Sequence, residues 1–298
     1  MTHGFRTTRR GLAGFAAGAG GLLLAGAALG GTVEIDFNGD NFPMPASITN
    51  DYLPLSLGTA VFRGIAGDEC EFSKQTIGFA NADYPSPYTV NGVQVLVVRD
   101  QEWATDAVDG ECDLDSAELD EDTVDFYAQQ NTGDGDGAVW YLGEDTFARP
   151  DEGEGPECSD EGAWRAGDDA GAVLAGILML ADPKSGDRYQ QEFDEDNAED
   201  MAAVLRKNGK VTIEFGEGAT YSKCLVTREW TPLEPGSVEK KWYCMAQGDF
   251  PGGLALVEEQ KGKTLRVEYI GDTLPPGDFP GDGEDFPAFA DLECTDPR

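Results

Sequence analysis

Apolar and polar residues alternate in short runs between residues 52 and 272, and turn-forming residues separate these runs. A period of two is typical of strands that bury one face. In YTVNGVQVLVVRD, Asn91-Gly92 lies between two β-branched runs, which is a strong signal for a two-residue hairpin. Further strands are expected at residues 123–129, 138–142, 211–215, 223–230, 238–245, 254–259 and 264–270.

This pattern predicts a mainly β fold, either an antiparallel sandwich or an open, curved, barrel-like sheet with one or two short helices. In DNAEDMAAVLRKNG, Asp196 and Glu199 have the spacing of a capping box and Asn208-Gly209 supplies an end signal, so a helix is expected there. AGAVLAGILML, residues 170–180, is apolar throughout and too short to span a membrane, which indicates a buried helix or strand.

Residues 1–30 are typical of a removable export signal, because basic residues precede a long acid-free stretch of Gly, Ala and Leu. The pair Arg9-Arg10 after two threonines resembles a twin-arginine signal, and the alternative is an ordinary secretory signal. The protein is therefore expected in the periplasm, outside the cell or on the cell surface. No stable membrane insertion is expected after the signal is removed.

The rest of the chain is expected to form one domain between two extended segments. Residues 31–51 predict an extended arm, residues 52–272 a single β-rich domain, and residues 273–298 an acidic tail rich in Gly and Pro. Two acidic stretches, 106–125 and 151–169, are expected to be solvent-facing loops.

The net charge of the chain is −36, with 57 acidic residues against 21 Lys and Arg. Such a surface repels nucleic acid and anionic lipid and attracts cations. A nucleic-acid partner is therefore excluded, whereas the acid surplus by itself names no other partner and indicates no oligomeric state.

An even number of cysteines in an exported chain predicts three disulfide bonds. No C-x-x-C spacing is present, so a zinc ribbon is not expected. Cys224 and Cys244 fall on neighbouring expected strands and are the first pair that we expect. The six candidates are Cys70, Cys112, Cys158, Cys224, Cys244 and Cys294.

The chain has a single histidine, His3, which lies inside the expected export signal. Removal of the signal leaves no imidazole, which excludes Ser-His-Asp and Cys-His catalysis and histidine-based metal sites. With the thiols paired, carboxylates, hydroxyls and amines are the groups left to bind or react.

Three long phrases, AVWYLGEDT, DPKSGDRYQQE and REWTPLEPG, carry a resemblance to a family of secreted bacterial β-rich proteins of unassigned function. The resemblance extends over about residues 52–270 and implies a shared fold and export. It supplies no catalytic residue.

The segment QQNTGDGDGAVWYLGED places acids and glycines between two expected strands. Its main expected role is a tight reversal, in which the glycines supply positive φ angles. The added hypothesis is a calcium ion held by Asn131, Asp134 and Asp136, because calcium prefers oxygen ligands. The match to an EF-hand loop is poor.

Trp140-Tyr141 and Trp242-Tyr243 are adjacent aromatic pairs inside expected strands. Neighbouring side chains on a strand point to opposite faces, so the two rings of a pair cannot enter the same core. Either both faces of the sheet are covered, or these four residues line a site for an apolar or carbohydrate ligand.

The sequence favours a non-enzymatic binding or cell-surface module with an unknown ligand. The alternative is a hydrolase that uses two carboxylates on a polysaccharide or another polymer, since this chemistry needs no histidine. Its candidate catalytic residues are Asp168, Glu192, Glu234 and Glu239.

Overall fold

The computed structural model describes residues 31–66, 69–108, 111–112, 117–149, 158–215, 218–261 and 263–272. The expected export signal and the whole acidic tail, residues 273–298 with Cys294, lie outside these ranges. Within the described ranges, no helix has the length and apolar character needed to cross a membrane.

Nearly all regular structure is β. The strands are β1 (Gly58–Ala66), β2 (Glu69–Ile77), β3 (Tyr88–Val90), β4 (Val93–Val108), β5 (Glu111–Cys112), β6 (Glu118–Gln129), β7 (Val139–Ala148), β8 (Trp164–Arg165), β9 (Leu174–Met179), β10 (Arg188–Gln190), β11 (Glu192–Phe193), β12 (Met201–Ile213), β13 (Ala219–Trp230), β14 (Glu239–Cys244), β15 (Gly253–Lys261) and β16 (Lys263–Gly271). A 3-10 turn at Gly39–Asn41 and the four-residue α1 (Asp168–Gly171) are the helical elements of the described chain.

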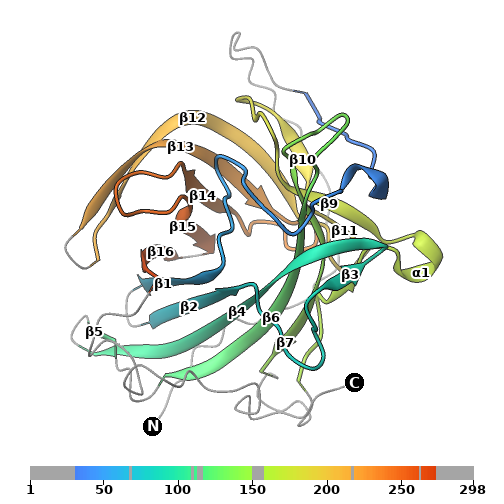
Figure 1. Cartoon of the computed structure of the whole chain (residues 1–298). Coiled ribbons are helices and arrows are strands. Elements are labelled where there is room, and N and C mark those ends of the chain that lie inside the picture. The colour runs from blue at the N-terminus through green and yellow to red at the C-terminus, as the bar shows by residue number, and fades with distance from the viewer. Residues whose placement is uncertain are drawn as a thin grey trace, which may run out of the picture.

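These strands form one antiparallel sheet in the order β10-β12-β13-β14-β15-β16-β1-β2-β4-β6-β7-β9-β11. Figure 1 shows the sheet curving around a common interior, with β12 and β13 on one side and β4, β6 and β7 on the other. The mainly β, barrel-like fold expected from the sequence is confirmed.

A single short segment brings the two ends of this strand order together. β10 pairs with β12 through Tyr189 and Ala202, and two residues later β11 pairs with β9 through Glu192 and Ala175. The Tyr189 hydroxyl also reaches the carbonyl of Leu178 at 3.5 Å. The sheet is therefore nearly closed, and few strand edges remain unpaired.

The Asn91-Gly92 hairpin is confirmed. Val90 pairs with Val93, and Asn91 and Gly92 have φ angles of 46° and 78°. Positive φ at both turn residues gives the primed turn whose twist matches that of the flanking strands.

The helix expected between Asp196 and Gly209 is wrong, because β12 occupies Met201–Ile213. The capping-box contact still forms: the Asp196 amide donates to Glu199 Oε1 at 2.9 Å, but in a turn that leads into a strand. Ala202 and Val204 are buried, whereas their neighbours Met201, Ala203 and Leu205 are half-buried or exposed. The strand period therefore prevails over the local helix signals. Asn208, with φ of 58°, lies at an irregularity in the β12–β13 pairing.

The apolar stretch 170–180 is a strand for most of its length. β9 covers Leu174–Met179 and pairs with β7 on one side and with β11 on the other. Ala175, Ile177 and Met179 are buried. Leu178, on the other face, is half-buried and lines the interior cavity, so both faces of the strand are largely covered and the segment is apolar without clear alternation.

The first expected disulfide is confirmed: Cys224 and Cys244 face each other on β13 and β14 and are bonded. Cys70 on β2 is bonded to Cys112 on β5. Cys158 is also disulfide-bonded, and no described cysteine is free.

The first acidic stretch, 106–125, is not a solvent-facing loop over its whole length. Its last eight residues belong to β6, where Asp122 and Asp125 are buried. In the second stretch, 151–169, Trp164 is buried on β8.

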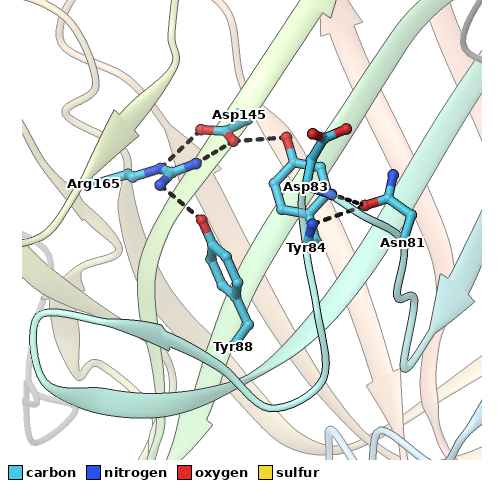
Figure 2. Close-up of polar contacts among 6 residues, drawn as sticks. All are labelled: Asn81, Asp83, Tyr84, Tyr88, Asp145 and Arg165. Atoms are coloured by element: carbon cyan, nitrogen blue, oxygen red, sulfur yellow. Dashed lines mark hydrogen bonds and ion pairs between the residues drawn. The ribbon is translucent and has the colours of Figure 1, made fainter.

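A polar clamp fixes the β3 hairpin to the sheet (Figure 2). Arg165 Nε donates to Asp145 Oδ1 at 2.9 Å, and a second guanidinium nitrogen pairs with Oδ2. The Tyr84 hydroxyl donates to the same carboxylate at 2.8 Å, and Arg165 also donates to the Tyr88 hydroxyl at 2.9 Å. The guanidinium lies 5.0 Å from the ring centre of Phe126. This clamp therefore holds three separate segments in register.

Replacement of Arg165 by Met should lower the free energy of unfolding by about 2–3 kcal/mol, because it leaves the buried Asp145 without its cation. The loss is smaller than for a fully buried pair, since the Arg165 side chain is 33% exposed. Urea denaturation measures the change. Arg188→Met, at an exposed arginine, is the control and should change stability by less than about 0.5 kcal/mol. Equal losses for the two variants would contradict the clamp.

Candidate functional site

The sheet encloses a cavity of about 1190 Å³. Among the described residues that line it, ten are acidic and two, Arg63 and Lys241, are basic. Acidic side chains therefore dominate the titratable groups on the described lining of this cavity.

Strand alternation places these acids on one wall. Successive side chains on a strand point to opposite faces, so every second residue faces the interior. β2 contributes Glu71, β4 contributes Asp100 and Glu102, and β6 contributes Glu121 and Asp125. In the register of the sheet Glu102 pairs with Glu121.

Glu71 and Glu102 have no hydrogen-bond or ion-pair partner among the described residues. Both are deeply buried, yet each keeps some accessible surface, which faces the cavity that they line. Burial, together with the nearby Glu259 and Glu239, raises the pKa of Glu71 to about 8. Burial and the neighbouring carboxylates, above all Glu121, raise the pKa of Glu102 well above its usual range.

The acids deeper along the same wall have protein donors. Asp100 accepts from the Ser73 hydroxyl at 2.7 Å and from Gln75 Nε2 at 2.8 Å. Burial raises the pKa of Asp100, although these two hydrogen bonds act against the shift.

The Tyr141 hydroxyl lies between two further carboxylates. It contacts Asp125 Oδ1 at 2.5 Å and Glu144 Oε2 at 2.7 Å, and Asp125 pairs with Glu144 in the sheet. Burial and the charge of Asp100 raise the pKa of Asp125 to about 7. One hydroxyl proton cannot serve both acids, and burial raises the pKa of Asp125 and of Glu144, so near neutral pH this pair favours holding a proton of its own.

The two basic lining residues do not neutralise Glu71 and Glu102. Lys241 Nζ lies 2.8 Å from Glu239 and 3.1 Å from Glu229. Burial alone would lower the pKa of Lys241, but these two carboxylates hold it well above its ordinary value. The Arg63 guanidinium lies over aromatic rings, 4.9 Å from the ring centre of Phe215.

The two expected aromatic pairs occupy different places in the fold. Trp140 packs against Phe37 and Phe42, at ring-centre distances of 5.3 and 6.3 Å, and donates to Gln130 Oε1 at 2.9 Å. Trp242 is buried in a separate cluster. Of the four residues, only Tyr243 is among the described residues that line the cavity. The Tyr141 hydroxyl contacts Asp125 and Glu144, which do line it.

The four candidate catalytic acids do not converge. Asp168 begins α1 and Glu234 lies in the turn before β14, whereas Glu239 lines the cavity and is paired with Lys241. Glu192, on β11, is half-buried, and desolvation together with Asp200 raises its pKa to about 8.

The segment between β6 and β7 forms a tight reversal. Gly133, Gly135 and Gly137 have φ angles between 78° and 95°. The Gln130 amide donates to the carbonyls of Thr132 and Asp134, at 2.8 and 2.5 Å.

Two observations at this reversal bear on the calcium hypothesis. Asn131 Oδ1 accepts from the Met44 amide at 3.1 Å. Nowhere in the described ranges do three or more His, Cys, Asp or Glu residues gather in a way that could hold a metal ion. Calcium binding by Asn131, Asp134 and Asp136 stays a prediction without structural support.

Sequence reasoning missed Glu71, Asp100, Glu102, Glu121 and Asp125. Their signal was the spacing of polar residues by two within β-like segments. Acids stand at 100 and 102, and at 121 and 125 with Thr123 between them. Against 57 acids in the chain, that spacing was not distinctive.

Comparison of the chain with protein-family models, with curated proteins and with solved structures finds no match. The resemblance to a secreted β-rich family therefore stays a prediction, and the function has to be argued from the cavity itself.

The stability of the ligand-free protein should fall as the pH rises from about 5 to about 8. The pKa of Glu71 is raised from 4.5 to about 8 in the folded state, so the folded protein binds this proton more tightly than the unfolded chain does. The free energy of unfolding then decreases between these two values. Thermal melting across this pH range measures the effect.

The double variant Glu71→Gln/Glu102→Gln should melt at a higher temperature than the unchanged protein at pH 8 and show a flatter pH dependence. Glu195→Gln, at an exposed glutamate, removes one charge outside the cavity and should leave the slope unchanged. A double variant with an unchanged slope would show that these buried acids do not control the pH dependence.

Proposed function

We propose that the protein is a non-enzymatic binding module that holds a small, positively charged organic ligand inside the barrel-like sheet. The observation that carries this proposal is the pair of buried carboxylates, Glu71 and Glu102, which face the cavity without a partner among the described residues. A buried charge is costly unless it is paired. A cationic ligand would supply the missing partner.

The shape of the site supports binding. The cavity volume of about 1190 Å³ lies slightly above the usual range for small-molecule pockets and leaves room for an extended ligand. Its walls are strands held by main-chain hydrogen bonds, so the carboxylates are fixed before a ligand arrives. Such preorganisation lowers the entropic cost of binding.

A cation suits the cavity better than the apolar or carbohydrate ligands considered from the sequence. No tryptophan is found among the described lining residues, so of the four aromatic residues expected to bind such ligands only Tyr243 is part of this space. The raised pKa values of Glu71 and Glu102 mean that these acids hold protons in the empty cavity near neutral pH, and only a cationic ligand would favour their ionised form.

The disulfide bonds support a location outside the cytoplasm. The bonds Cys70–Cys112 and Cys224–Cys244 are typical of proteins from oxidising compartments. We therefore place the binding module outside the cytoplasm, as a periplasmic, extracellular or cell-surface protein.

The second candidate is a hydrolase that acts on a polymer, and it rests on Glu102 and Glu121. These residues pair across β4 and β6, and burial raises the pKa of Glu102, as a general acid requires. Release of reducing ends from a polysaccharide, abolished by Glu102→Gln, would favour this candidate over pure binding.

Isothermal titration at low ionic strength should distinguish a cation site from a general polar pocket. 1,4-Diaminobutane should bind and 1,4-butanediol, of equal length but uncharged, should not, because only the amine can neutralise the carboxylates. Glu71→Gln/Glu102→Gln should weaken diamine binding by at least about tenfold, whereas the exposed control Glu195→Gln should change it by less than about twofold. Equal binding of the diol, or an unaffected double variant, would overturn the proposal.

A further inference from the structure

We infer that the ligand of this cavity is a linear polyamine with at least three amines, bound along the wall formed by β2, β4, β6 and β7. This inference rests on the proposed function and extends it from a single charge to a row of charges.

The carboxylates of this wall lie at three successive levels. Glu102 and Glu121, paired across β4 and β6, form the first level. Asp100, two residues along β4 from Glu102, forms the second. Asp125 and Glu144, paired across β6 and β7, form the third. All five residues line the same cavity.

The spacing of the levels follows from strand geometry. Two residues along a strand advance by about 7 Å, so the first and third levels are about 14 Å apart. Amines joined by three or four methylene groups repeat on a similar scale. An extended triamine can therefore place one ammonium near each level.

The unpartnered acids identify where the row begins. Glu71, on β2, interacts electrostatically with Glu102 and with Glu259 on the opposite wall. Glu71 and Glu102 lack a hydrogen-bond or ion-pair partner in the described part of the chain, so this end offers the strongest attraction for a terminal ammonium. At the far end, a second ammonium would relieve the competition of Asp125 and Glu144 for the Tyr141 hydroxyl.

Apolar side chains flank the third level of this wall. Ile77 and Val98 lie in the same cross-strand row as Asp125 and Glu144, and Tyr127 follows two residues further along β6. The methylene groups next to an ammonium at this level would therefore contact apolar surface.

A compact metal ion does not fit the row. Across the described ranges, no three acidic, histidine or cysteine side chains come close enough to share one ion. Charges distributed along a wall select a ligand whose own charges are distributed in the same way.

Calorimetry with three probes tests the inference on the disulfide-bonded protein. Spermidine, an extended triamine, should bind at least about tenfold more tightly than 1,4-diaminobutane, because it reaches one more level. Hexaamminecobalt(III) has the same charge of +3 in a compact shape and should bind no more tightly than the diamine. Equal binding of spermidine and hexaamminecobalt(III) would overturn the inference and leave a cation site of the proposed kind.

Two variants locate the ends of the ligand. Asp125→Asn should reduce the preference for spermidine over the diamine by at least about fivefold, because it removes a charge from the third level only. Glu102→Gln should weaken both amines, and Glu195→Gln neither. A spermidine preference that Asp125→Asn leaves unchanged would overturn the inference, whereas loss of all amine binding in unmodified protein would overturn the proposed function as well.

Discussion

Burial of like charges inside a nearly closed sheet is the constraint on which the rest of the structure depends. β2, β4 and β6 each turn every second side chain inward, so their acids share one enclosed space in which water screens them poorly. The pKa of Glu71 is raised to about 8 by burial first and by neighbouring carboxylates second. Ionised acids in such an interior oppose folding, so the folded protein favours the protonated form of Glu71.

The outside of the sheet supplies the stability that the interior lacks. Arg165 joins β8, β7 and the β3 hairpin through Asp145 and Tyr88. Arg99 donates to the buried Asp122 at 2.8 Å on the same face. The Cys70–Cys112 bond ties β2 to β5. These contacts hold the walls in place, so the carboxylates cannot relax apart when the cavity is empty.

Several features could be predicted from local sequence because they depend on neighbouring residues. Asn91-Gly92 predicted its hairpin, since positive φ is intrinsic to that pair of residues. The Cys224–Cys244 pair followed from two adjacent strands. The helix expected after Asp196 does not form. Its capping contact with Glu199 is present, but such a contact is local and is compatible with a turn. The following residues gain more from pairing with β13 as β12 than from an isolated helix.

The sequence by itself determined that the protein is β-rich, acidic, disulfide-bonded and without histidine once its expected signal is removed. These properties follow from composition and from a period of two along the chain. Only the tertiary structure decided which of 57 acids meet. Glu71 and Glu102 lie on the paired strands β2 and β4, and Glu239, far away in the chain on β14, lines the same cavity because the sheet curves around a common interior. Contacts that depend on the curvature of the whole sheet give no signal in the local sequence around the residues that meet.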